Sequence, residues 1–257
     1  MPPPIRLHNP ASTLRAARLL ARLALLALSS LGCRAEPSDA IPPRCRQIVL
    51  VIARDWNSSS GTLRRFSRSS THGSWAAVGD AVPVLIGEHG LGWAAGLRSI
   101  PDDRSPRKRE GDRRSPAGVF QLTAVFSREK LDGIRMPLLP ITPATEAIDD
   151  PGSRYYNRIV DRREIAQPDW RSSERMAKIR DYDLCIAVGS NPSRQPGGGS
   201  CVFIHVWSGQ RPGTAGCTAL RYPDLLTLVR WLDPAQEPVL IQAPRDAAGF
   251  LPASLRF

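Results

Sequence analysis

Apolar residues along this chain mostly follow the spacing of β-strands, as two-residue alternation or as short continuous runs. Residues 47–54 form a β-branched apolar run that predicts a first strand. Only residues 222–232 place apolar side chains at helical spacing over three turns, with Asp224 near the start. Residues 172–180 predict a second, short helix capped by a serine. Further strands are predicted at residues 62–68, 75–78, 81–86, 118–126, 184–188, 201–207 and 239–242. The pattern therefore predicts a mainly β fold with a few short helices.

Three segments interrupt this pattern. Gly79 and Asp80 predict a break between two strands. Residues 88–96 hold three glycines and predict a loop, and residues 144–168 are polar and irregular. No internal repeat and no linker divides residues 45–257, so we expect them to form one domain.

The N-terminal residues predict export. Basic residues precede and interrupt an apolar stretch, residues 19–31, which is too short to span a bilayer comfortably. We expect residues 1–35 to be a secretory signal peptide and residues 36–44 a short tether, which places the protein in the periplasm or cell envelope. Residues 30–33 also resemble a lipobox, in which Cys33 would become a lipidated N-terminus and the only point of membrane attachment. An uncleaved membrane anchor is a third alternative.

The formal charge of +11 narrows the class of partner. Removing the five arginines of residues 1–35 lowers it to +6, which still favours an anionic polymer. Basic residues are scattered rather than interleaved with aromatics, so we expect no nucleic-acid partner. The chain has no C-x-x-C pair, and His72, His89 and His205 are far apart, so we expect no metal and no cofactor.

The candidate catalytic residues lie in the segment 199–220. A predicted strand carries His205 near its end, and a Gly/Pro-rich loop leads to Gly216 and Cys217 before the predicted helix. A helix N-terminus and a nearby imidazolium both lower the pKa of a thiol, which favours a nucleophilic role for Cys217. Main-chain N–H groups around Cys217 could hold an oxyanion. The alternative is that Cys217 is a buried small residue or half of a disulfide.

Three more cysteines follow the predicted signal region: Cys45, Cys185 and Cys201. In an oxidising compartment, and with Cys217 a working thiol, one pair and one spare cysteine are expected. Cys185 and Cys201 lie on strands predicted to face each other, so we hypothesise that they pair.

Several short motifs occur together in one order. They are residues 86–93 (IGEHGLGW), 110–120 (EGDRRSPAGVF), 149–151 (DDP), 156–157 (YN), 203–207 (FIHVW) and 214–217 (TAGC), together with Trp75 and Ser153. With these motifs the chain resembles the L,D-transpeptidase (YkuD-like) catalytic domain, in a branch with a T-A-G-C nucleophile motif. The resemblance implies a YkuD-like β-sandwich-type fold.

The resemblance also implies an activity. Such an enzyme attacks the carbonyl of the third residue of a peptidoglycan stem tetrapeptide, releases D-Ala, and passes the acyl group to an amine of a neighbouring stem. By this match Cys217 is the nucleophile and His205 its base. Gly216 and Thr218 flank the nucleophile and are expected to supply backbone contacts to the oxyanion. The expected partners are peptidoglycan stem peptides, and the product is a 3→3 cross-link for cell wall biogenesis.

The chain departs from the better-studied members of this family near the nucleophile. Ala215 replaces a second histidine, Ala219 stands where Asn or Arg is common, and the spacing from His205 to Cys217 is shorter. Hydrolysis of the same stems (L,D-carboxypeptidase), attachment of a protein to the wall, and a non-catalytic envelope lipoprotein therefore stay open.

Four residues are weaker candidates for substrate binding. Asp150, Tyr156 and Asn157 lie in a predicted loop, where they either contact substrate or cap the loop. Trp207 follows His205 by two residues, so it lies on the same strand face and either lines the site or covers the core.

Overall fold

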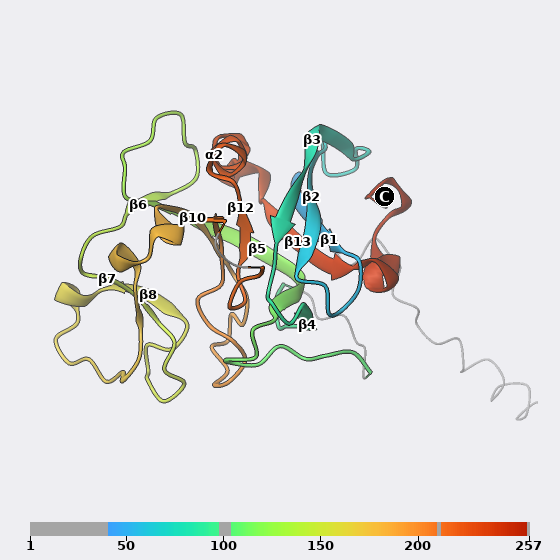
Figure 1. Ribbon diagram of the computed structural model, residues 1–257. Helices are drawn as coiled ribbons and strands as arrows, with labels where there is room; N and C mark the ends of the chain where they lie inside the picture. Colours follow the sequence, from blue (N-terminus) through green and yellow to red (C-terminus); the bar gives the residue numbers. More distant parts are fainter. Residues whose placement is uncertain (1–40, 98–103, 210–211, 256–257) are drawn as a thin grey trace, which may run out of the picture. The chain divides into compact units, whose positions relative to one another are not determined.

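Strand pairing in the computed structural model, which describes residues 41–97, 104–209 and 212–255, closes a barrel-like sheet (Figure 1). β5 pairs with β13 on one side and with β10 on the other, so eight strands of the described residues follow one another around the sheet. The order is β10 (Leu184–Val188), β11 (Phe203–Val206), β12 (Thr218–Leu220), β3 (Ala76–Leu85), β2 (Ser60–Ser67), β1 (Gln47–Ala53), β13 (Val239–Pro244) and β5 (Ser115–Ser127). The predicted mainly β, YkuD-like fold is confirmed in this form.

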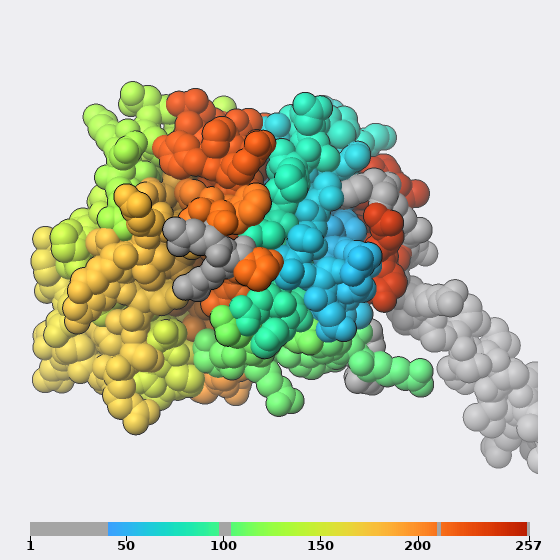
Figure 2. All heavy atoms as spheres, viewed as in Figure 1, coloured from blue at the N-terminus to red at the C-terminus, as the bar shows by residue number. Residues whose placement is uncertain are grey.

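Smaller elements surround the barrel. β4 (Leu91–Trp93) and β6 (Leu138–Pro140) pair with β5. A separate three-stranded sheet, here the small sheet, consists of β7 (Thr145–Ile148), β8 (Arg158–Asp161) and β9 (Glu174–Arg175). Single 3-10 turns lie at Arg162–Glu164, Met176–Lys178, Arg180–Tyr182, Pro234–Gln236 and Ala253–Leu255, and a longer one at Arg245–Phe250. Figure 2 shows the yellow and gold residues around the small sheet gathered on the left of the view, on the opposite side from β1 and β2.

β1, β10, β12 and β13 are buried on both faces, which explains their continuous apolar runs, whereas β2 is mostly half-buried and β3 is largely exposed. In β1, Val49 and Val51 belong to the largest core cluster, whereas Ile48, Leu50 and Ile52 pack on the other face against the C-terminal turns. The helix α2 (Tyr222–Trp231) buries Leu225, Leu228 and Val229 in the largest cluster. Its Pro223 lies in the first turn, where the missing N–H costs nothing. A third core cluster lies between the outer face of β10 and β11 and the small sheet, and it includes Phe126, Met176, Tyr182, Cys185 and Phe203.

Four local predictions need correction. β3 is continuous through Gly79, whose φ of 66° is accommodated by a register shift opposite Leu63–Arg65 of β2. The predicted loop at 88–96 contains β4, and the polar segment 144–168 contains β7 and β8. The helix predicted at 172–180 is instead β9 followed by 3-10 turns. β4, β7, β8 and β9 are short, so the pairing of their backbone groups forms them without a clear apolar alternation.

The N-terminal predictions lie mostly outside the described residues, since residues 1–40 are not among them. The described residues all belong to the unit Pro37–Phe257. The end of the predicted tether is described, and there Ile41 is buried in the core cluster beneath the C-terminal turns.

The hypothesis of a Cys185–Cys201 disulfide is wrong, because Cys45, Cys185, Cys201 and Cys217 are all free. Cys185 lies directly opposite His205 in the β10–β11 pair, and Cys201 precedes His205 by four residues. Cys201 lies outside β11, with a φ of 46°, and is not paired with β10.

Candidate active site

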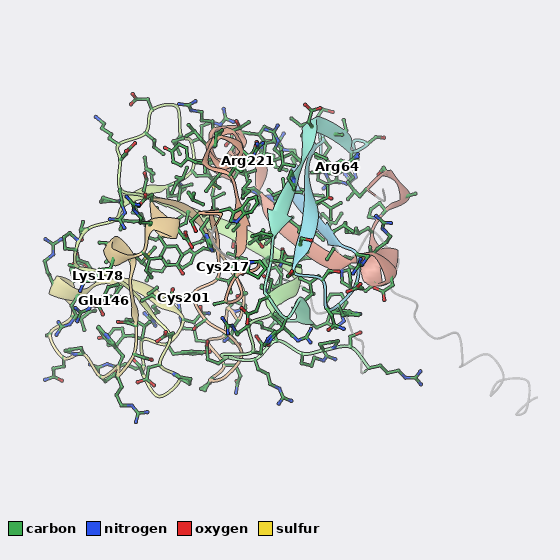
Figure 3. All side chains as sticks on the ribbon, in the orientation of Figure 1. Arg64, Glu146, Lys178, Cys201, Cys217 and Arg221 are labelled. Atoms are coloured by element: carbon green, nitrogen blue, oxygen red, sulfur yellow. The ribbon has the colours of Figure 1, made fainter. Side chains whose placement is uncertain are left out.

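Of the two predicted catalytic residues, His205 lies on β11 and Cys217 directly precedes the neighbouring parallel strand β12. β11 pairs with β12 so that Ile204 is opposite Thr218 and His205 is opposite Ala219. Cys217 directly precedes β12, and side chains alternate along a strand, so Cys217 shares one face with Phe203 and His205. Figure 3 shows Cys217 near the centre of the view, with Cys201 toward the side of Glu146.

The backbone of the nucleophile is held by two hydroxyl groups. The Cys217 carbonyl accepts hydrogen bonds from Ser115 Oγ at 2.7 Å and from Thr214 Oγ1 at 2.6 Å. Ser115 Oγ in turn accepts the Gly87 N–H at 2.8 Å. Thr214 is tied to the same segment, because its N–H donates to the Ile86 carbonyl at 2.8 Å. The motifs around residues 87, 115 and 214 therefore meet at the peptide group of Cys217.

Gly216 is required by the local backbone. Its φ is 147°, outside the range that L side chains readily adopt, and a Cβ there would lie 3.1 Å from the Arg114 carbonyl oxygen. The Gly216 N–H donates to Thr214 Oγ1 at 3.1 Å, so this amide is already engaged. Thr218 directs its hydroxyl to Gln242 Oε1 at 2.8 Å, in the buried interior. The contacts of both residues are structural, and their oxyanion role stays a prediction.

The Cys217 thiol is half-buried and accepts a hydrogen bond from the Phe203 N–H at 3.3 Å. Burial, together with the negative charge of Glu174, raises its pKa to about 12. The Phe203 amide, the Lys108 cation and the Tyr182 hydroxyl act in the opposite direction but do not compensate. The thiol is therefore protonated at neutral pH and needs a base before it can attack.

The prediction that Cys217 lies at a helix N-terminus is wrong. The residues after it form β12, and α2 begins only at Tyr222. The apolar residues Ala219 and Leu220 extend the sheet beside β11 before Pro223 enters the first helical turn. No helix dipole therefore acts directly on the thiol.

His205 is oriented as a neutral base. Its Nδ1 lies 2.8 Å from the Val206 carbonyl oxygen, which can only accept, so Nδ1 carries the proton and Nε2 carries the lone pair. Burial lowers its pKa, opposed by the Val206 carbonyl and the charge of Asp181. The ring is packed edge-to-face with Tyr182 at a centroid distance of 5.6 Å. His205 is thus neutral at physiological pH and able to accept a proton at Nε2.

Sequence reasoning missed three residues at this site. Tyr182 donates its hydroxyl to Glu174 Oε2 at 2.6 Å, and burial raises the pKa of both groups. Lys108 is buried, and its Nζ lies 2.6 Å from Asp112 Oδ1. These residues come from segments far from His205 and Cys217 in sequence, and no spacing pattern connects them. For Lys108 the one available signal is its position just before the EGD motif.

The weaker substrate-binding candidates are mostly engaged within the protein. Asp150 accepts the backbone N–H groups of Gly152 at 2.9 Å and Arg171 at 2.7 Å, which lower its pKa. Asn157 has a φ of 58° and accepts the Cys201 N–H at 2.8 Å. Its Nδ2 donates to the carbonyls of residues 190 and 191, at 3.0 and 2.9 Å. These contacts favour the loop-capping alternative for both residues.

Tyr156 and Trp207 are placed differently. The hydroxyl of buried Tyr156 donates to Glu110 of the EGD motif in a short hydrogen bond, and burial raises its pKa. The Trp207 backbone N–H donates to the Leu220 carbonyl at 2.7 Å, continuing the ladder beyond β11. Its indole Nε1 is buried and finds no hydrogen-bond acceptor among the described residues. Trp207 therefore remains a predicted substrate contact, whereas Tyr156 links the EGD motif to the small sheet.

Neither a metal site nor a membrane-spanning helix was found in the part of the chain that the structure describes. There, no three His, Cys, Asp or Glu side chains are grouped to bind a metal. No helix within the same ranges has the length and apolar character to cross a bilayer.

Comparison with known families identifies the class of protein. The YkuD family model, described as an L,D-transpeptidase catalytic domain, matches residues 57–241, which is more than half of the chain. The chain therefore belongs to the YkuD L,D-transpeptidase catalytic-domain family. The matched range contains Ser115, His205, Thr214 and Cys217. No curated protein and no solved structure gives a significant match. Because the family acts on the cell wall, membership implies a place in the cell envelope.

Proposed function

We propose that this protein is a peptidoglycan L,D-transpeptidase that forms 3→3 cross-links through an acyl-enzyme on Cys217, with His205 as the base. The observation that carries the proposal is the placement of His205 and Cys217 on one face of adjacent strands. The fixed tautomer of His205 and the two hydroxyls that hold the Cys217 carbonyl support it. Family membership supports stem peptides as the substrate class.

The first half-reaction starts from a neutral pair. The Cys217 thiol has a pKa of about 12 and is protonated, and the buried His205 ring is neutral. Nε2 takes the thiol proton as sulfur attacks the carbonyl of the third stem residue, which gives a tetrahedral oxyanion and an imidazolium. When the oxyanion collapses, the bond to D-Ala breaks and its nitrogen takes the proton from Nε2. The products are a thioester on Cys217, free D-Ala and neutral His205.

The second half-reaction runs the same steps with an amine. The side-chain amine of a neighbouring stem attacks the thioester carbonyl and gives a proton to Nε2. Collapse of the intermediate forms the new amide and expels the sulfur, which recovers its proton from His205. The chain thus returns to its starting protonation state. Water in place of the amine would make the enzyme an L,D-carboxypeptidase.

The proposal includes export. Residues 1–35 would direct the chain to the compartment that holds peptidoglycan, and a lipidated Cys33 is the alternative form of attachment. The four free cysteines are consistent with a domain that does not depend on disulfides for its fold.

The test is mass spectrometry of purified disaccharide-tetrapeptide stems incubated with residues 36–257, beside Cys217→Ala and the matched control Cys45→Ala. Cys45 is buried in the core cluster under the C-terminal turns and should not affect the products. Dimers that have lost one D-Ala, formed by wild type and Cys45→Ala but not by Cys217→Ala, support the proposal. Tripeptides alone would reassign the enzyme as a carboxypeptidase. Unchanged stems in every sample would overturn the proposal in favour of a non-catalytic envelope protein.

A further inference from the structure

Lys108 is a buried cation next to the nucleophile loop. Its side chain is 5% exposed, and Nζ donates at 2.6 Å to both Asp112 Oδ1 and the Arg109 carbonyl. A Cβ built on Gly216 would lie 3.9 Å from Nζ, and one on Gly199 would lie 3.4 Å from it. The Lys108 ammonium is therefore enclosed between the loop that precedes Cys217 and the loop that precedes β11.

A charge at this buried position carries a free-energy cost that an apolar side chain would not. Burying an ammonium costs free energy that only close partners offset, and an apolar side chain of similar length would fill the same space. Asp112 is the counter-ion, but its oxygens also accept the backbone N–H groups of Arg109 at 2.6 Å and Arg114 at 2.9 Å. Asp112 is thus shared between Lys108 and the backbone of its own turn, while Nζ also lies close to the loop at Gly216.

Several titratable groups face the Cys217 thiol. They are Glu174 of β9, Tyr182 of the 3-10 turn Arg180–Tyr182, Cys185 of β10 and Cys201 of the loop before β11, and His205 shares the strand face of Cys217. Among these, Glu174 disfavours a negative charge on sulfur. Lys108 is the cation that acts on the thiol in the opposite direction. A site that must carry a transient thiolate next to a carboxylate therefore depends on this lysine.

We propose that Lys108 is an electrostatic positioning residue for Cys217: its buried ammonium, seated against the Gly216 backbone, stabilises negative charge on the sulfur. The proposal rests on the proposed role of Cys217 as nucleophile. Lys108 does not contact the substrate in this role, and it acts only through the nucleophile loop.

The test is the rate of alkylation of Cys217 by iodoacetamide as a function of pH, with the modified cysteine identified by peptide mass spectrometry. The variants are Lys108→Met and Lys108→Arg in the mature chain, with Lys130→Met as control for loss of an exposed lysine. A nearby unit charge at an effective dielectric constant of ~20 shifts a pKa by about one unit or more. Lys108→Met should therefore alkylate about tenfold more slowly at a given pH, with its profile displaced to higher pH. Lys108→Arg should stay near wild type, and Lys130→Met should match it.

A second variant covers the case in which Lys108→Met does not fold. Asp112→Asn removes the counter-ion and keeps Lys108, so its profile should move to lower pH, opposite to that of Lys108→Met. Superimposable profiles for wild type and a folded Lys108→Met, or no shift to lower pH in Asp112→Asn, would overturn the proposal. Alkylation needs no stem peptide, so this result is independent of turnover. An unshifted profile in an active enzyme rejects only the role of Lys108, and a shifted profile without turnover rejects only the proposed function.

Discussion

Replacing Ser115 by alanine should weaken the fold and the nucleophile together. Ser115 is fully buried, and its hydroxyl accepts the Gly87 N–H at 2.8 Å while donating to the Cys217 carbonyl at 2.7 Å. Alanine removes both contacts with little change in volume. The Gly87 N–H would then be buried without an acceptor, whereas the Cys217 carbonyl would keep its bond from Thr214 Oγ1.

The expected magnitude follows from these two different losses. A buried donor left without a partner costs about 1–3 kcal/mol, and a hydrogen bond whose acceptor retains another donor costs less. We therefore expect the free energy of unfolding of Ser115→Ala to fall by about 2 kcal/mol, which lowers the Tm by roughly 4–8 °C for a domain of this size. The rate of Cys217 acylation should fall as well, because the peptide group that aims the thiol has lost one of two restraints.

The assay is urea unfolding combined with single-turnover acylation, for Ser115→Ala, Thr214→Val and the double variant. Both hydroxyls donate to one carbonyl, so the double variant should lose about 1 kcal/mol more than the sum of the single losses. Ser193→Ala, at an exposed position, is the matched control and should be neutral. If Ser115→Ala loses less than ~0.5 kcal/mol, within the usual range for surface changes, and acylates at the wild-type rate, the hydroxyl does not hold the nucleophile.

Two further predictions concern stability. Burial raises the pKa of the Cys45 thiol to about 11, so above pH 9 the unfolded chain releases this proton while the folded chain keeps it. The free energy of unfolding should therefore decline between pH 9 and 11, by up to roughly 3 kcal/mol from this group. Urea titrations at several pH values should show a shallower decline in Cys45→Ala than in wild type. An equal decline in both would exclude Cys45 as the cause. Asn157→Ala removes three hydrogen bonds, including the one to the Cys201 N–H, and leaves alanine at a φ of 58°. Asn157→Ala should lower the free energy of unfolding, measured by chemical denaturation, by about 2–4 kcal/mol. Asn157→Gly should lower it less, because glycine tolerates that φ. A neutral Asn157→Ala would show that this side chain does not anchor the loop before β11.

The sequence predicts those elements whose own residues contain the signal. The buried run of β1 and the helical spacing of α2 are local patterns, and both elements form where these patterns lie. Closure of the barrel depends on β5 pairing with β10 and β13, which are distant in sequence, so no local pattern indicates it. The polar strands β7 and β8 form through backbone pairing and show no apolar alternation of the usual kind.

The candidate site likewise contains residues that the sequence predicts and residues that it does not. Cys217 and His205 are found from a short motif, because nucleophile and base lie on consecutive strands of the chain. The helix expected after Cys217 is wrong, since apolar residues next to a strand can extend the sheet as readily as they begin a helix. Ser115 reaches the Cys217 carbonyl, and Lys108 and Glu174 act on the thiol, only through tertiary structure, so their roles follow from distances and burial rather than from spacing.

The central claim is that Cys217 carries the acyl group. Its most direct test is rapid quenching of the mature enzyme with stem tetrapeptide, followed by intact-protein mass spectrometry and mapping of the modified peptide. We expect a mass increase equal to the tetrapeptide stem minus D-Ala, located on Cys217 and absent from Cys217→Ala. Turnover of stems without any adduct on Cys217, or with the adduct on Cys185 or Cys201, would contradict the account.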